Sequence, residues 1–436
     1  MNDHASALRG ASLARCILRK CEARDQESVF NFCAPYFTES WVDPHEKSLE
    51  TYRQGHFAGM ESGDIESAFL NSFAAVQLAQ CCGSPLGSIG IITRELLLQM
   101  DLYNIKSVSC LMDQVYLSNQ YLSGSIKCIE PPWHDLATEP LGDRRTSSEN
   151  LRLLHWYLVR VELGVYFGNY EFADQMAEEL RKVLPRHPAF ITKSFRLFYS
   201  SLAAAGKSRQ MKGKRTQVRK YKKKAKRHAI ELGYLNKSHG ANSYHRELIL
   251  LAELNLVDKE QNKVSYDTAI NACLKVGHIH DAALGSELAG KYYLAKNDHK
   301  EGTISHTTNQ KLIRRHFTRA RDLYSLWGAH AKVEQLQRER GDYIQGRKAY
   351  ENGGIVAIDL DSDVSRASSD IDYSSTHSSE FSKASGPPVL YNPRLLDLLE
   401  GIVPSSGTTG ADKPFGDKNI EGDDLSMMSD IDTDTF

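Results

Sequence analysis

Apolar residues recur at three- and four-residue intervals along most of the chain, which is the spacing of one face of an α-helix. Short turns rich in Gly, Pro, Asn and Asp separate these stretches. The predicted fold class is therefore all-α. Helices are predicted at 8–37 (one or two), 46–61, 65–82, 88–103, 106–123, on both sides of a turn at 168–170, at 189–205, 216–232, from 244, through 266–273, from Asp281 and at 311–340, with loops at 124–147, 258–263 and 297–310.

Small residues line one face of several predicted helices. Ala173, Ala177 and Leu180 stand at i, i+4 and i+7, and Pro185 follows five residues later. This spacing is typical of the second helix of a tetratricopeptide unit, although an ordinary helical hairpin can also have it. We expect antiparallel helix pairs stacked into a right-handed superhelix, in which each pair buries its apolar stripe against its neighbours. The predicted repeat core comprises Ala173, Ala177, Leu180, Tyr266, Ala269, Leu288, Tyr292, Ala320, Tyr324 and Trp327.

Shifts in composition divide the chain into five predicted parts. They are N-terminal helices at 1–45, a first group of repeats at 46–205, a basic linker at 206–227, a second group of repeats at 228–341 and a tail at 342–436. The tail is acidic, rich in Ser and poor in residues that form cores, so we predict that it is disordered.

The tail holds one amphipathic island at 388–400, which is suited to binding a groove as an induced helix. The candidate partner-binding residues of this island are Leu390, Tyr391, Leu395, Leu396, Leu398 and Leu399. Ser369 and Ser429 each precede Asp-Ile-Asp and are candidate phosphorylation sites, because a phosphate there adds charge that an Arg-bearing partner can bind.

Bulk composition excludes several classes of protein. The 436 residues carry a formal net charge of −1, which gives the whole chain no bias toward nucleic acid or membranes. The eight cysteines form no C-x-x-C pair, which argues against zinc ligation or a disulfide framework. Neither a secretory signal nor an apolar run long enough to span a bilayer is present, so we expect a soluble, cytoplasmic protein.

A basic run at 207–227 is the strongest local charge feature, with twelve Lys and Arg residues. An exposed helix face is one explanation, and a nuclear localisation signal or a nucleic-acid contact is the other. Tyr221 is the only aromatic residue in the run, so base stacking has little support. The candidate basic patch comprises Lys220, Lys222, Lys223, Lys224, Lys226 and Arg227.

Motifs with catalytic or ligand-binding potential are weak. Ala205-Gly206-Lys207-Ser208 matches the end of a phosphate-binding loop, but position 201 is Ser where that loop needs Gly. His278 and His280 stand two residues apart in a predicted turn and are interpreted as exposed polar residues, whereas His245 begins a helix and is expected to pack or cap it. We therefore predict no catalytic, cofactor-binding or metal-ligating residues.

Residues 244–340 resemble a known family, the tetratricopeptide-like helical region of very large signalling proteins. These proteins also contain a serine/threonine kinase-like domain, an AAA-type ATPase module, a GAF domain and often a histidine kinase. The resemblance is carried by Tyr244-His245-Arg246-Glu247, Tyr266-Asp267-Thr268-Ala269-Ile270, Glu287-Leu288-Ala289-Gly290-Lys291-Tyr292-Tyr293-Leu294 and Trp327-Gly328-Ala329. It extends more faintly through most of 10–340, without any catalytic domain of the family.

The resemblance implies a non-catalytic scaffold that binds a protein or peptide on the superhelix, within intracellular signalling. One alternative is a fragment or in-trans subunit of an ATPase/kinase signalling protein. A second alternative is an RNA-associated repeat protein that uses 207–227, and the same run leaves a nuclear location open. No cofactor is expected under the first of these interpretations.

Overall fold

The structure is a computed structural model, which describes residues 4–126, 133, 136, 147–183, 190–211, 213–239, 242–256, 263–297, 304–344 and 402. The tail island and both candidate phosphorylation sites lie outside these residues. Within them the fold is all-α and contains no strand. The fold class predicted from the sequence is therefore confirmed.

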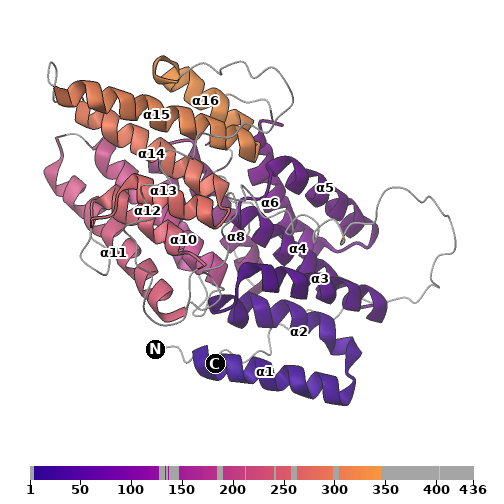
Figure 1. Ribbon diagram of the computed structural model, residues 1–436. Coiled ribbons are helices and arrows are strands. Elements are labelled where there is room, and N and C mark those ends of the chain that lie inside the picture. Colours follow the sequence, from indigo (N-terminus) through magenta and orange to yellow (C-terminus); the bar gives the residue numbers. More distant parts are fainter. Residues whose placement is uncertain are drawn as a thin grey trace.

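The helices follow one another with short connections (Figure 1). Their bounds are α1 (His4–Cys21), α2 (Glu27–Cys33), α3 (His45–Ser62), α4 (Ile65–Cys81), α5 (Leu86–Leu102), α6 (Lys106–Ser123), α8 (Ser147–Tyr166), α9 (Tyr170–Val183), α10 (Phe190–Gln210), α11 (Arg215–His239), α12 (Tyr244–Leu254), α13 (Tyr266–Lys275), α14 (Ile279–Asn297), α15 (Ile304–Trp327) and α16 (His330–Arg340). Short helical turns η1 (Arg24–Gln26), η2 (Ala34–Thr38), η3 (Glu39–Trp41) and η4 (Gly341–Tyr343) complete the described part.

Consecutive helices pack as antiparallel pairs, which is the arrangement of a helical-repeat superhelix. The strongest pairings join α3 to α4, α5 to α6, α8 to α9, α10 to α11 and α14 to α15. A left-handed glycine makes the turn in the first of these, since Gly63 has φ +85° and Asp64 then caps α4 by accepting from the Ser67 N–H. In the last pair, α15 packs closely on α14 because Gly290 leaves room for the ring of Phe317.

The superhelix turns back on itself, so that its C-terminal helices pack against its N-terminal half (Figure 1). The Trp327 indole N–H donates to the Ser84 carbonyl over 3.1 Å, across 243 residues of sequence. The Gln335 amide donates to the Phe167 carbonyl over 3.0 Å, and α16 packs on α6. The C-terminal helices α15 and α16 therefore cover part of the N-terminal half.

The predicted repeat core lies inside this array. Nine of its ten residues are buried, and Tyr292 is half-buried against the same hydrophobic cluster. Burying the large aromatic side chains Tyr324 and Trp327 stabilises the fold because it removes most of their apolar surface from water.

Some predicted boundaries were wrong. Residues 311–340 form two helices rather than one, because Gly328 adopts φ +88° and ends α15 after Trp327. The predicted loop at 297–310 is helical from Ile304 onward. Residues 206–210 end α10 and 215–227 begin α11, so the basic run is mostly helix rather than linker.

Two further expectations concern cysteines and membranes. The seven cysteines in the described residues are free thiols. Among the described helices, none combines the length and apolar character that crossing a bilayer requires.

Candidate functional site

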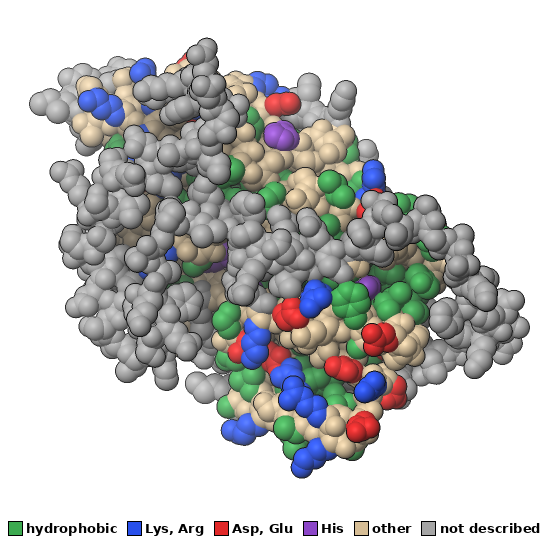
Figure 2. Space-filling view, turned by 45° about the vertical axis from the view of Figure 1, so that its right-hand side comes forward, with side chains coloured by type: hydrophobic (Ala, Val, Ile, Leu, Met, Phe, Trp, Pro, Cys, Tyr) green, Lys and Arg blue, Asp and Glu red, His purple; other side chains and the backbone are tan. Residues whose placement is uncertain are grey.

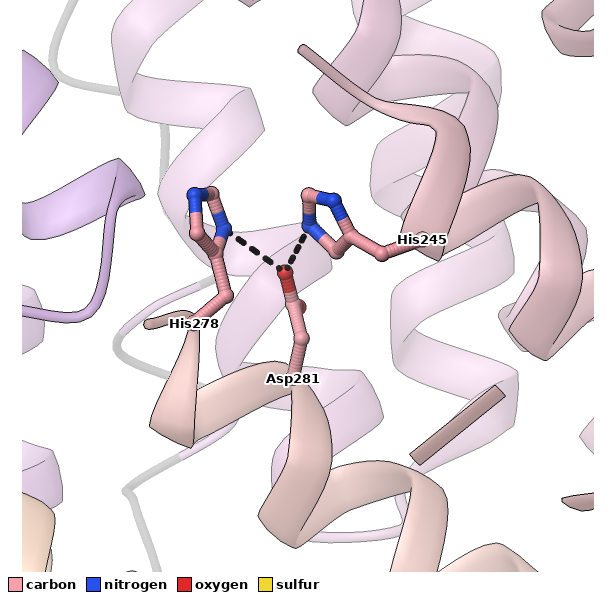
Figure 3. A group of neighbouring side chains, drawn as sticks. All are labelled: His245, His278 and Asp281. Carbon is pink, nitrogen blue, oxygen red and sulfur yellow. Dashed lines mark hydrogen bonds and ion pairs between the residues drawn. The ribbon is translucent and has the colours of Figure 1, made fainter. Parts of the chain in front are cut away.

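A cluster of charged and imidazole side chains is buried where α12 meets the start of α14 (Figure 3). His245 and Arg246 lie in the first turn of α12, His280 and Asp281 lie in the first turn of α14, and His278 directly precedes α14. All five are buried, and Asp281 has no exposed surface. The prediction that His278 and His280 are exposed was wrong, because both imidazoles find partners in the interior.

One carboxylate oxygen, Asp281 Oδ2, is the centre of the cluster. Arg246 Nε donates to it over 2.8 Å and His245 Nε2 over 3.0 Å. His278 Nδ1 and His280 Nε2 each lie 3.5 Å from the same oxygen. This helix was predicted to begin at Asp281, but α14 begins at Ile279, and the Asp281 side chain binds α12.

Electrostatics keep Asp281 and Arg246 charged and keep His245 and His280 neutral. Burial alone would raise the pKa of Asp281, but the Arg246 guanidinium holds it well below its usual range. Burial lowers the pKa of His280 to about 3, and it lowers the pKa of His245 well below its ordinary value. At neutral pH the cluster therefore combines the Asp281 carboxylate, the Arg246 guanidinium and the neutral imidazoles of His245 and His280.

The cluster also connects distant parts of the array. Arg246 Nη2 donates to the Cys81 carbonyl at the end of α4 over 2.8 Å, and the Arg246 guanidinium lies 4.1 Å from the centre of the Phe195 ring on α10. The His280 ring packs against Trp327 of α15 with centroids 5.4 Å apart. A Cβ on Gly83 would meet His280 Nδ1 at 2.4 Å, so the turn after α4 also depends on this packing.

Three of these residues have the spacing of metal ligands. One donor atom each from His245, His278 and Asp281 lies within 4.8 Å of the others, and Figure 3 shows both imidazoles facing the same carboxylate oxygen. That oxygen already accepts from Arg246, so a dication there would lie beside a buried positive charge. We interpret the cluster as a buried ion pair that joins α4, α10, α12, α14 and α15, rather than as a metal centre.

A second polar group lies beside the cluster. Ser118 of α6 and Tyr199 of α10 donate to the two carboxylate oxygens of Glu162 on α8, over 3.2 and 3.3 Å. Burial raises the pKa of Glu162 to about 7. This carboxyl group therefore changes charge close to neutral pH.

A third buried group joins α14, α15 and α16. Glu287 accepts from the Tyr324 hydroxyl over 2.8 Å and pairs with Lys291 over 2.7 Å and Lys332 over 3.2 Å. Burial alone would raise the pKa of Glu287, but Lys291 and Lys332 lower it to about 2. Unlike the first cluster, this group places two ammonium groups around one carboxylate, and burial lowers the pKa of Lys332.

The segment that matched a phosphate-binding loop lies inside α10. Its Lys207 is buried and pairs with Asp174 over 2.9 Å and with Glu171 over 3.0 Å. A helix at this position has its N–H groups bonded along the helix, so they cannot wrap a phosphate. Lys207 therefore connects α10 to α9.

The candidate basic patch is divided by the geometry of α11. Lys224 points toward α9, where it pairs with Asp174 and Glu178. The other five members, Lys220, Lys222, Lys223, Lys226 and Arg227, are exposed. The patch thus combines one structural lysine with a solvent-facing group.

An apolar stripe on the outer face of α5 was not predicted. We define it as Ile91, Leu98 and Leu102, which are 64, 55 and 84 % exposed. At 100° per residue these three point within about 40° of one another. The signal in the sequence was a helix that is apolar on all sides, since its opposite face already buries Ile89 and Leu96.

A surface hollow of about 220 Å³ lies beside this stripe, at the turn between α5 and α6. Leu97, Met100 and Ile105 supply its apolar lining, and Asp101 and Asp113 are among its polar residues. Figure 2 turns this side of the molecule forward and shows hydrophobic side chains among charged ones on the described surface.

Comparison of the chain with models of known protein families, with curated proteins and with solved structures found no match in any of the three. The resemblance of residues 244–340 to signalling proteins therefore stays a prediction.

Proposed function

We propose that this protein is a non-catalytic helical scaffold that binds a partner protein on the outer face of α5. The expected occupant is an amphipathic helix of the partner, whose apolar side chains cover the stripe and enter the hollow between α5 and α6. The resemblance of residues 244–340 supports a role in a signalling assembly. The three buried charge groups support a structural task for the interior.

The exposure of the α5 stripe is the observation that carries this proposal. Ile91, Leu98 and Leu102 follow a spacing of seven and four residues, which is the pattern of a helix–helix seam. From Ile91 to Leu102 the stripe spans roughly 16 Å, about three turns of a partner helix. The contacts of α15 and α16 with the N-terminal half cover part of the array, whereas the outer face of α5 stays exposed to a partner.

Photo-crosslinking provides the test. A photoreactive residue is introduced at Leu98 of the full chain, and the captured protein is identified, purified and titrated against the full chain. We expect L98D/L102D to weaken this binding more than tenfold, because burying each leucine contributes about 1.5–3 kcal/mol.

The matched control is L13D/I17D on α1, which changes two exposed apolar residues at the same i, i+4 spacing. This variant should bind as the unchanged chain does. Equal losses in both variants, or an unchanged Kd in L98D/L102D, would refute a binding surface on α5.

A further inference from the structure

The exposed side of α11 carries a basic stripe, which we define as Arg215, Arg219, Lys222, Lys223 and Lys226. All five side chains are exposed, and at 100° per residue they fall within a sector of about 100°. Within the described residues, none of the five has an ion-pair partner. The helix packs on α10 and α12 through its other side and lies at the edge of the array in Figure 1.

The same face becomes partly apolar toward the end of α11. Ile230 is 46 % and Tyr234 is 63 % exposed, and both lie in line with the basic stripe. Lys237 is exposed one turn further on, with its ammonium 5.6 Å from the centre of the Tyr234 ring. A ligand complementary to this face must therefore combine several negative charges with apolar side chains.

Charge is distributed very unevenly along the chain. Residues 1–351 carry 49 Lys and Arg against 39 Asp and Glu, whereas residues 352–436 carry 5 against 16. The near-zero net charge thus conceals a basic body of about +10 and an acidic tail of about −11. Opposite charges of this size on one chain attract each other over about a Debye length, ~8–10 Å.

The last sixteen residues have the composition that the α11 face requires. Residues 421–436 hold six Asp and Glu and no Lys or Arg. Leu425, Met427, Met428, Ile431 and Phe436 are interspersed with these acids. The acidic stretch 359–380 also holds six acids, but it includes Arg366 and fewer large apolar residues between them.

Ile402 shows where the tail is attached. It is 2 % exposed and belongs to the main hydrophobic cluster, so the chain that follows it starts from the folded body. Eighteen residues separate it from Glu421, and this length of chain can reach at most about 65 Å. Because the segment belongs to the same chain, its local concentration at α11 exceeds that of a separate molecule, which favours even weak ion pairs.

We propose that residues 421–436 dock on the α11 face of the same chain. The acids pair with the basic stripe, and the apolar side chains of the segment cover Ile230 and Tyr234. The docked segment and an external polyanion would therefore compete for the same basic side chains. Phosphorylation of Ser429, within the docked segment, would add negative charge and strengthen the contact.

The test uses the full chain with photoreactive benzoylphenylalanine introduced at Met428. Crosslinks are formed at 50 mM NaCl, separated by size and mapped by mass spectrometry. Most should join 428 to residues 215–237 within one chain. K223E/K226E should reduce the yield at least threefold, and 500 mM NaCl should do the same, because salt screens exposed charges.

The matched control is K311E/R314E on α15. It reverses two exposed charges at the same i, i+3 spacing, and neither residue has an ion-pair partner among the described residues. This variant should leave the crosslinks to α11 unchanged. Circular dichroism of both variants checks that they keep the same helix content.

Three results would overturn the proposal. One is a crosslink pattern that K223E/K226E leaves unchanged. Another is crosslinking that joins two chains, which assigns the face to a second copy. The third is binding of a uridine 20-mer that depends on Lys223 and Lys226 but is the same with and without D423N/D424N/D430N/D432N, which assigns the face to nucleic acid. None of these experiments involves α5, so they are independent of the proposed partner surface.

Discussion

Replacing Asp281 with Asn tests whether the buried cluster holds the superhelix closed. The substitution keeps the shape of the side chain but leaves the Arg246 guanidinium, also buried, without a counter-charge. At an effective dielectric constant of about 20, two charges ~4 Å apart interact by about 4 kcal/mol. Breaking one partner of a buried pair costs about 3–5 kcal/mol by mutagenesis, so the two arguments give the same magnitude for D281N.

Urea unfolding at pH 7.5, followed by circular dichroism, measures this loss. The control is E95Q in the exposed Arg94–Glu95 pair, which should cost less than about 1 kcal/mol. Removing both charges in R246M/D281L should recover at least about 2 kcal/mol relative to D281N, because no uncompensated charge is left. Hydrogen exchange in D281N should increase first at the end of α4, since Arg246 donates to Cys81 there.

The reasoning would be refuted if D281N cost less than about 1 kcal/mol, or if the double variant were as unstable as the sum of the two single ones. Either result would mean that water or a neighbouring group compensates Arg246, and that packing alone closes the array.

Two further predictions concern pH and close packing. Several buried histidines have lowered pKa values, about 3 for His45 and His280 and about 4 for His155, so their contribution to stability is complete above about pH 6.5 and is lost as the pH falls below it. Glu162, whose pKa is raised to about 7, acts in the opposite direction, but several buried histidines outweigh one carboxyl group, so the melting temperature should fall between pH 7 and pH 5. A melting temperature that is higher at pH 5 than at pH 7 would contradict the assignment of neutral imidazoles. G290A should cost about 1–3 kcal/mol, because its Cβ would lie 2.8 Å from the Phe317 ring, whereas G87A on α5 meets no atom within 4 Å and should be neutral or stabilising. Equal unfolding free energies for the two glycine variants would show that α14 and α15 can separate without cost.

Helical periodicity was sufficient to predict the class of fold. Each helix buries one face in the interior, so apolar residues recur at helical spacing along the chain. Most helices were placed within a few residues, and the predicted repeat core is buried. The break at Gly328 was missed, since the residues around it continue the apolar pattern of one helix. The return of α16 onto α6 could not be predicted either, because it depends on contacts between residues far apart in sequence.

The buried charge groups were harder to predict than the core. His278, His280 and Asp281 occupy a segment that looks polar and therefore exposed when it is taken alone. Their burial is possible because Arg246, 35 residues earlier, supplies the compensating charge. In the sequence, Arg246 and Asp281 are two polar residues far apart, and nothing there relates them. They become neighbours only when α12 packs against α14.

Helix geometry divides the lysines and arginines of the basic run into an inward-facing group and an outward-facing group. Lys207 and Lys224 are directed inward, where both pair with Asp174, whereas the stripe on α11 is directed outward. Deleting the whole run would therefore remove structural ion pairs together with the exposed surface, and a loss of binding would have two explanations. K223E/K226E separates them, because it leaves Lys224 in place. If this variant keeps its stability and loses the crosslinks from residue 428, the outward charges act in recognition and the inward ones in folding.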